Sequence, residues 1–450
     1  MTTCPKIAEP TMPSRSSSTG QSPGRWHRDW HAAGRAFATT LGVAMLLASL
    51  DAGPVFAQSP AISTTLEPSV RSSGMGRASN AVFWGGDPDY WGNPALLGYY
   101  DGIRYEHGST QLVPDLADDV YFTTKRITLG AYGLGLALSG EPFDGMGSTR
   151  LSYGVSQATS STGEDLGSFE SYEDIKSWGI GLSLGRAMES IWRRADKPAP
   201  AVTRYVDVAL GMNWKDVTVV LSPDLPGLPG AGQGSGHAND QGLFVRVSPY
   251  NSFDGARLIP ALDSTLALRL DGSFGISTIN QGEVTFVADN RSDNMVEEHR
   301  TGWAARMAAH PIALKTHLED DHLAWLNQTL SPLLSFGAAW DKVTFNSEIV
   351  DPSGAVSVRE SEIEHTGWEL SLLNFVTIRR GHISDPDGSI DGPTTGWSAG
   401  LTYAGVLGFR YDEATVPQAT DPITGQHLAN VHRSAWTVFM DPIEASRRIF

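Results

Sequence analysis

Acidic residues and histidines that lie close together in the chain are the first candidates for chemistry. The run HLEDDH at 317–322 offers imidazoles and carboxylates, which bind divalent metals. Its two histidines are five residues apart, a poor spacing for one helix face, so we interpret the run as a solvated loop. The run DPDGSIDG at 385–392 is similar to a calcium loop, but Gly396 stands where a bidentate glutamate is required. We therefore expect an acidic turn there and no metal site.

The chain offers no clear centre for covalent or acid–base catalysis. Its single cysteine, Cys4, lies before the expected cleavage point described below, so we expect the exported chain to contain no cysteine. Glycoside hydrolysis needs two carboxylates at a defined separation, and the spacing of the Asp and Glu residues selects no pair. We also expect no nucleophile elbow, in which a serine stands on a strand-to-helix turn. The sequence predicts a protein that is not an enzyme, with no catalytic residue and no cofactor.

Charge and hydropathy narrow the class of protein. The 450 residues include 33 Lys and Arg against 50 Asp and Glu, a net charge of −17. A nucleic-acid binder normally shows a basic surface, so we expect no nucleic-acid partner. The mean hydropathy of −0.19 argues against a bundle of membrane helices. Glycine (48) and tryptophan (13) are both abundant, and tryptophan favours membrane interfaces.

The first 57 residues have the pattern of a signal peptide. Arg25, Arg28 and Arg35 precede an apolar run at 36–50, and Ala57 follows as a small residue at the expected cleavage point. A single membrane anchor is the alternative, but that run is shorter than the ~20 residues of a spanning helix. We therefore expect export, and with the strand pattern below, location in the cell outer membrane.

Beyond residue 100, apolar and small or polar residues alternate in segment after segment. In 178–185, Trp178, Ile180 and Leu182 face one way, with Gly179, Gly181 and Ser183 on the other face. Such ~10-residue segments are typical of strands in an outer-membrane barrel. We count fourteen to sixteen candidates, because a run such as 127–140 has room for two strands and a turn. A secreted soluble sandwich is the alternative, but small residues on one face and tryptophans near strand ends favour a closed barrel.

Charged side chains fall on the face of these strands that would point into the lumen. They need partners there, and two interpretations stay open: salt bridges with Asp207, Asp271 and Asp412, or a path for amphipathic carboxylates. We expect long polar loops on one side of the barrel and short turns on the other. The predicted lumen-facing residues are Arg246, Arg269, Asp271, Arg306, Arg379, Arg410 and Asp412.

The segment 71–100 is too irregular to face lipid, so it must lie outside the barrel or buried within it. Gly74-Met75-Gly76-Arg77-Ala78 is expected to open a short helical or coiled stretch. Asp87-Pro88 and Asn93-Pro94 are expected to force turns, because the residue before proline is pushed out of the α region.

These residues, with Asp87 and the box Asn93-Pro94-Ala95-Leu96, resemble the start of the outer-membrane long-chain fatty-acid transporter (FadL-type) family and its PorV/PorQ-type relatives. A weaker similarity lies at 368–412. The resemblance implies an all-β, fourteen-stranded antiparallel transmembrane barrel at 101–450, with a plug at 58–100 after the signal peptide at 1–57. The plug or gating residues that it implies are Gly74, Met75, Gly76, Arg77, Asp87, Asn93, Pro94 and Ala95.

Two functions follow from the resemblance. A FadL-type member takes up hydrophobic or amphipathic small molecules, whereas a PorV-type member is a non-catalytic partner or shuttle in type IX protein secretion. The expected partners are outer-membrane lipid, the barrel-assembly machinery, a hydrophobic ligand and, for the second function, secretion-system components. The chain departs from the barrel pattern at its end, because Pro442 interrupts the last segment and we expect that strand to end near Met440.

Overall fold

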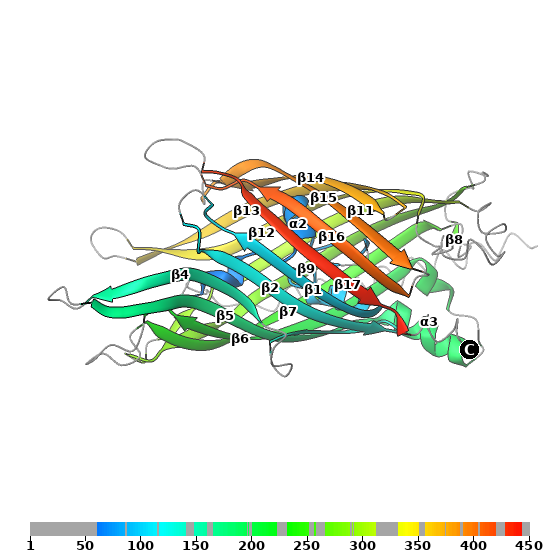
Figure 1. Ribbon diagram of the computed structural model, residues 1–450. Helices are drawn as coiled ribbons and strands as arrows, with labels where there is room; N and C mark the ends of the chain where they lie inside the picture. Colours follow the sequence, from blue (N-terminus) through cyan, green and yellow to red (C-terminus); the bar gives the residue numbers. More distant parts are fainter. Residues whose placement is uncertain are drawn as a thin grey trace, which may run out of the picture. The chain divides into compact units, whose positions relative to one another are not determined.

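A computed structural model describes residues 61–442 except 86–87, 115–116, 141–147, 160–164, 196, 198–199, 223–231, 252–255, 258–265, 289, 291, 312–331, 351–355, 374, 388–389, 404–405 and 420–427. The signal peptide, Asp87 and the HLEDDH run lie outside the described residues. The described chain forms one antiparallel sheet that closes on itself, because β1 (Gly102–Gln111) pairs with both β2 (Tyr121–Ala131) and β17 (Val431–Met440) (Figure 1). The predicted barrel is confirmed, and its last strand ends at Met440.

The remaining strands follow in chain order around the barrel. They are β3 (Leu134–Ser139), β4 (Thr149–Thr159), β5 (Asp165–Ser183), β6 (Val206–Val220), β7 (Gln233–Asn251), β8 (Ala256–Arg257), β9 (Leu266–Phe286), β10 (Ser292–Asn294), β11 (Glu298–Pro311), β12 (Leu334–Val350), β13 (Val356–Leu372), β14 (Val376–Asp385), β15 (Ile390–Tyr403) and β16 (Leu407–Val416).

Fourteen crossings of the wall account for the seventeen strands among the described residues. β3 and β4 lie end to end between β2 and β5, so the two count as one. β10 and β11 are likewise successive pieces beside β9. β8 has two residues and only extends the edge of β7, so it crosses nothing. The suspected turn within 127–140 is real, with Tyr132 and Gly133 between β2 and β3, both at positive φ.

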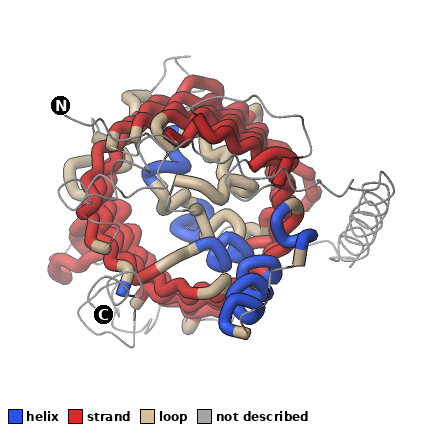
Figure 2. Tube along the Cα trace, turned by 90° about the vertical axis from the view of Figure 1, so that its right-hand side faces the viewer, coloured by secondary structure: helices blue, strands red, loops and turns tan. Residues whose placement is uncertain are grey.

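The segment before β1 fills the lumen, and we call residues 61–100 the plug. It contains η1 (Ile62–Thr65), α2 (Val70–Gly74) and η2 (Pro94–Tyr99). Figure 2 shows helix and loop segments inside the ring of strands. Most plug side chains are buried, including Met75, Trp91 and Leu96. The inner face of the wall is buried because the plug covers it.

One sequence expectation about the connections is wrong. Long connections occur at both ends of the barrel. Residues 184–205 and 312–333 join consecutive strands at the end where β1 begins and β17 ends. Residues 221–232 and 417–430 join consecutive strands at the opposite end. The connection at 184–205 also contains helix α3 (Leu184–Arg194) and η3 (Ala201–Arg204), which the alternating pattern did not predict. The outward β5 pattern continues into α3 without a break, which hides the change of period.

Of the described helices, none combines the length and the apolar character that a membrane span requires.

Candidate functional site

The glycine motif ends a helix instead of opening one, which corrects the sequence expectation. Ser69 caps α2 by accepting the Ser72 backbone N–H at 3.2 Å, and Met75 follows the helix as its C-cap. Gly76 and Arg77 then adopt φ values of +67° and +66°. This left-handed turn ends α2 in the way that helices commonly terminate. A Cβ on Gly76 would lie 2.5 Å from the Thr366 carbonyl oxygen, so only glycine fits.

Small residues on the wall leave room for the plug backbone. Gly135, Gly181, Gly211 and Gly242 are direct cross-strand neighbours on β3, β5, β6 and β7. We call these four residues the glycine row. Each of them approaches the backbone or Asn93 side chain of the plug so closely that an added Cβ would lie within about 1.9–2.6 Å of plug atoms. The small-residue face that the sequence analysis noted is therefore the seat of η2.

The Asn-Pro-Ala box forms the start of η2. The Asn93 side-chain oxygen accepts the Ala95 N–H at 3.1 Å, and Pro94 occupies the first turn, where its missing N–H is harmless. The Asn93 amide nitrogen donates to the carbonyl oxygens of Asn80 and Leu243, at 3.0 and 3.2 Å. Asn93 thus joins two parts of the plug to strand β7.

A buried ion-pair network holds the other side of the plug. We call Arg71, Glu369, Arg379, Asp412 and Arg410 the arginine network. Arg71 from α2 contacts Glu369 at 2.8 Å, and Arg379 contacts Glu369 at 3.1 Å and Asp412 at 2.9 Å. Arg410 contacts Asp412 at 2.6 Å and donates to the Gly85 carbonyl at 2.9 Å. Each carboxylate therefore has two guanidinium partners, which offsets the desolvation of the charges.

The remaining predicted lumen residues lie on the inner face of β7, β9 and β11. Arg269 pairs with Asp271 at 2.7 Å. The guanidinium of Arg246 lies 5.6 Å from the centre of the Phe83 ring of the plug. The Nε atoms of Arg246 and Arg306 are buried and have no hydrogen-bond partner among the described residues.

The expected salt bridge of Asp207 is not found among the described residues. Its carboxylate instead accepts hydrogen bonds from the hydroxyls of Tyr99 and Ser183, both at 2.6 Å, and from the Gly185 N–H at 2.8 Å. These neutral donors satisfy the carboxylate, since hydrogen bonds to a charged form stabilise it. Asp207 therefore fastens η2 and the start of α3 to β6.

A nucleophile-elbow pattern does occur, contrary to the sequence expectation. Residues 181–185 read Gly-Leu-Ser-Leu-Gly and stand where β5 passes into α3. Ser183 is nevertheless fully buried, donates to Asp207 and accepts the Arg186 N–H as the N-cap of α3. A serine so placed caps a helix and is closed to a substrate.

Several side chains that seat the plug were not selected from the sequence. Asp89 accepts the Ser79 hydroxyl at 2.7 Å, whereas the sequence analysis chose Asp87 as the motif's acid. Asp341 accepts the backbone N–H groups of Ser79 and Asn80 at 2.7 and 2.8 Å. Asp341 lies on the inner face of β12 between Ala339 and Val343, and one inward carboxylate on a strand carries no local signal that distinguishes it from others.

One plug carboxyl group is held in an unfavourable environment. Burial, reinforced by the nearby charge of Asp89, raises the pKa of Glu67 to about 8, and Arg300 at 3.9 Å opposes this only in part. Arg300 is itself occupied by Glu298 at 2.7 Å. Glu67 is therefore a titratable group inside the plug itself.

Aromatic side chains of the plug and the wall form a buried apolar cluster. Phe83 packs edge-on against Trp84 and lies near Tyr99 and Phe244, with ring centres 5.1–5.8 Å apart within the group. The nearby guanidinium of Arg246 gives this apolar surface a charged border. The plug therefore packs on this side of the wall through aromatic rings with a cation at their edge.

The outer face of the barrel carries an apolar belt bounded by an aromatic row. On β13 the outward residues nearest the end where β1 begins are apolar: Leu372, Leu370 and Trp368. Towards the other end of the strand they become polar: Thr366, Glu364 and Glu362. Members of the row touch across strands: Trp178 stacks on Trp214 with ring centres 3.9 Å apart, Trp303 on Trp340 at 6.5 Å, and Trp397 lies 5.6 Å from Tyr411. A girdle of this kind marks a membrane–water boundary.

No group of three potential metal-ligand side chains occurs in the described part of the chain.

Comparisons with known proteins place the chain beside hydrocarbon-channel structures at low similarity. No protein-family model matches the chain, and no curated protein matches it. The Pseudomonas putida toluene transporter TodX aligns with 86% of this chain and 99% of its own at 10% identity, with a TM-score of 0.38. The Ralstonia pickettii toluene transporter TbuX aligns with 82% of this chain and 95% of its own at 11% identity, with a TM-score of 0.33.

A Pseudomonas aeruginosa FadL homologue aligns with 82% of this chain and 97% of its own, at 10% identity and a TM-score of 0.30. At these identities and scores the likeness carries no argument about function. The fold of this chain is defined by the closed strand pairing described above.

Proposed function

We propose that this protein is an outer-membrane barrel that admits hydrophobic or amphipathic small molecules, with the plug as its gate. The observation that carries the proposal is the way the lumen is filled. The described part of the plug is bonded to the wall by separate hydrogen bonds and ion pairs, and no strand pairing joins these residues to the sheet. Such a segment can change place without opening the barrel itself.

The membrane location rests on the outer surface. Large apolar side chains there are exposed, including Trp303 at 52% and Leu401 at 61%. A soluble protein rarely exposes a continuous apolar band of this extent. The aromatic row at one edge of the belt, followed by charged residues, is what a barrel seated in lipid requires.

The chemistry of the lumen supports an amphipathic or hydrophobic cargo. The rings of Phe83, Trp84, Tyr99 and Phe244 pack together beside the guanidinium of Arg246, and movement of the plug would expose this apolar surface to a cargo. A bare ion or a sugar finds little on such a surface that favours it over water. We assign the gate to the plug residues Gly74, Met75, Gly76, Arg77, Asp87, Asn93, Pro94 and Ala95, and add Asp89, which accepts the Ser79 hydroxyl.

Uptake by whole cells tests this function. The barrel is expressed in a strain that lacks hydrophobic uptake barrels, and entry of a labelled alkylbenzene, a labelled medium-chain carboxylic acid and labelled sucrose is measured. We expect the first two to enter faster than in cells with an empty vector and sucrose to enter at the same rate. Equal rates for all three, with the folded barrel present in the outer membrane, would contradict the proposal.

A role as a secretion partner without small-molecule flux makes the opposite prediction. Such a barrel leaves all three uptake rates unchanged and is recovered together with secretion-system components after solubilisation. Both measurements are made on the same cells, so they separate the two functions.

A further inference from the structure

Helix α3 has an apolar face that the barrel does not cover. At 100° per residue, Leu184, Met188 and Ile191 fall on one side of α3, while Arg186, Glu189 and Arg193 fall on the opposite side. Leu184 is 42% exposed and Ile191 is 61% exposed. In a protein surrounded only by water, this arrangement would leave the apolar stripe of an amphipathic helix without a partner.

The first turn of α3 fixes the helix at the rim of the barrel. Arg186 binds both carboxylate oxygens of Asp101 at 2.6 Å and donates to the Gly98 carbonyl of the plug at 3.1 Å. A Cβ on Gly133 would lie 2.7 Å from the Ala187 nitrogen, so the helix rests directly on the β2–β3 turn. The helix therefore has a defined place at this edge.

The exposed stripe continues the belt of the barrel. The outward row of β5 consists of Trp178, Ile180 and Leu182, all exposed, and α3 begins at Leu184. Val202 of η3 is also exposed, at 39%. Since the belt is the surface that lipid covers, the stripe on α3 lies next to the same lipid.

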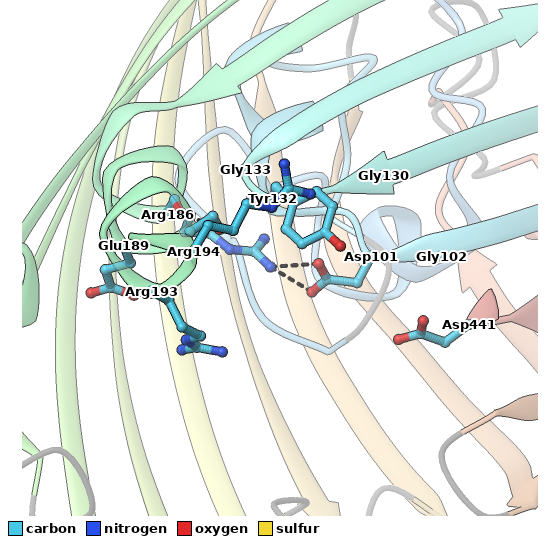
Figure 3. A pocket seen from close by; sticks show the side chains of 11 residues that line it. Asp101, Gly102, Gly130, Tyr132, Gly133, Arg186, Glu189, Arg193, Arg194 and Asp441 are labelled. Atoms are coloured by element: carbon cyan, nitrogen blue, oxygen red, sulfur yellow. Dashed lines mark hydrogen bonds and ion pairs between the residues drawn. The ribbon is translucent and has the colours of Figure 1, made fainter. Parts of the chain in front are cut away.

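The polar face of α3 borders a cavity of about 440 Å³ at the rim (Figure 3). Arg186, Arg193 and Arg194 line it together with the carboxylates of Asp101, Glu189 and Asp441. Arg194 lies over the Tyr132 ring at 4.5 Å, and Arg186 is held by Asp101. The mixed charge matches a layer of phospholipid headgroups, in which phosphates and cationic groups alternate.

We propose that α3 is an interfacial membrane helix. Its apolar stripe enters the phospholipid leaflet at the end of the barrel where β1 begins, and Arg193 and Arg194 contact headgroup phosphates there. Helices of this kind lie in the membrane plane with the apolar face in the acyl-chain boundary, and long basic side chains reach from that depth to the headgroups. The contact would fix how deeply the barrel lies in the membrane, and it would hold the β5–β6 connection (residues 184–205) beside the plug.

Spin labels on single cysteines test the position of the helix. With Cys4 replaced by serine, labels are placed at Ile191 and at Glu189 of the full chain in nanodiscs of phosphatidylethanolamine and phosphatidylglycerol, with a label at Leu182 as the lipid-facing reference. We expect the label at 191 to favour collisions with oxygen, as at 182, and the label at 189 to favour a water-soluble nickel complex. Equal access of the nickel complex at 191 and 189 would overturn the proposal.

Retention of lipid tests the headgroup contact. The variant Arg193→Gln/Arg194→Gln and the parent protein are released from the same nanodiscs, and phospholipids that stay bound are counted by native mass spectrometry. We expect the variant to retain fewer phospholipids, and added inorganic phosphate to leave the parent's retention unchanged. Equal retention by the two proteins overturns the contact, and loss of lipid on adding phosphate would show an ordinary anion site instead of a lipid surface.

Discussion

The plug meets the wall in two different ways. Beside β3 to β7, η2 rests on the glycine row, where backbone lies against backbone. Beside β13 to β16, α2 is also held by buried ion pairs of the arginine network. The first contact depends on the absence of side chains and the second on their charges. Side-chain charges therefore contribute most to the contact of α2, whereas the contact of η2 combines close backbone packing with the hydrogen bonds of Asn93 and Tyr99.

The largest effect is expected from Glu369→Gln, which attacks the charged sector. The change leaves Arg71 and Arg379 facing a neutral amide in a buried site. Loss of a buried partner in this way costs about 3–5 kcal/mol, measured as the free energy of unfolding in urea. Glu362→Gln is the control, since its ion pair with Lys342 is 47% exposed on the glutamate side and an exposed pair contributes at most about 1 kcal/mol. If both variants lost the same free energy of unfolding, the buried ion pairs would not hold α2 more strongly than an exposed ion pair holds its strands.

A smaller effect is expected from Gly211→Ala in the η2 sector. The added Cβ would lie 2.2 Å from the Pro94 carbonyl group, so η2 must shift. Overpacking of this kind costs about 1–3 kcal/mol. Gly272→Ala is the matched control, because a Cβ there meets no atom within 4 Å. If the two variants unfold at the same urea concentration, the glycine row is not a seat for the plug.

Asn93→Ala is expected to destabilise by about 1–2 kcal/mol, since it removes the cap of η2 and two donated hydrogen bonds. Asn93→Ser keeps an oxygen that can cap the helix and should recover part of the loss. Hydrogen exchange of the plug amides at 90–100 measures both. A serine variant no better protected than the alanine variant would argue against the capping role.

A pH dependence centred on Glu67 is also expected. Its pKa in the folded protein is about 8, above the ordinary 4.5, so the folded state favours the protonated form. The stability that this contributes is fully present at low pH and is lost as the pH rises through about 8. We expect the urea midpoint to fall from about pH 6 to about pH 9 in the parent and to fall less in Glu67→Gln. If the urea midpoints of the parent and of Glu67→Gln changed with pH in parallel, a group other than Glu67 would be responsible for the pH dependence.

Much of the wall could be predicted from the sequence, because the two-residue period is a local property that lipid enforces. The inward arginines follow from the same alternation, and the end at Met440 follows from Pro442. Partners across the lumen could not be predicted: Glu369 and Arg71 are 298 residues apart, and only the closed barrel brings them together. The same limit explains why Asp89 and Asp341 were passed over.

Helix α3 and the end of α2 show a different limit. The residues Leu182 and Leu184 continue a strand pattern, so the change to a helical period becomes visible only when Met188 and Ile191 are counted with them. At 74–78, glycines permit both the start and the end of a helix, and the close approach of Thr366 and His382 to Gly76 decides for the end. In both places the local sequence fits two structures, strand or helix at α3 and helix start or helix end at 74–78, and tertiary contacts select one of them.

Reversible locking of the plug tests most directly whether it is a gate. A Cβ on Gly74 would lie 3.6 Å from the Cβ of Arg379, a separation that suits a disulfide, and the only native cysteine is Cys4. In Gly74→Cys/Arg379→Cys with Cys4 replaced, we predict that oxidation abolishes uptake of the labelled alkylbenzene and that a reductant restores it. Full crosslinking with unchanged uptake would contradict the account.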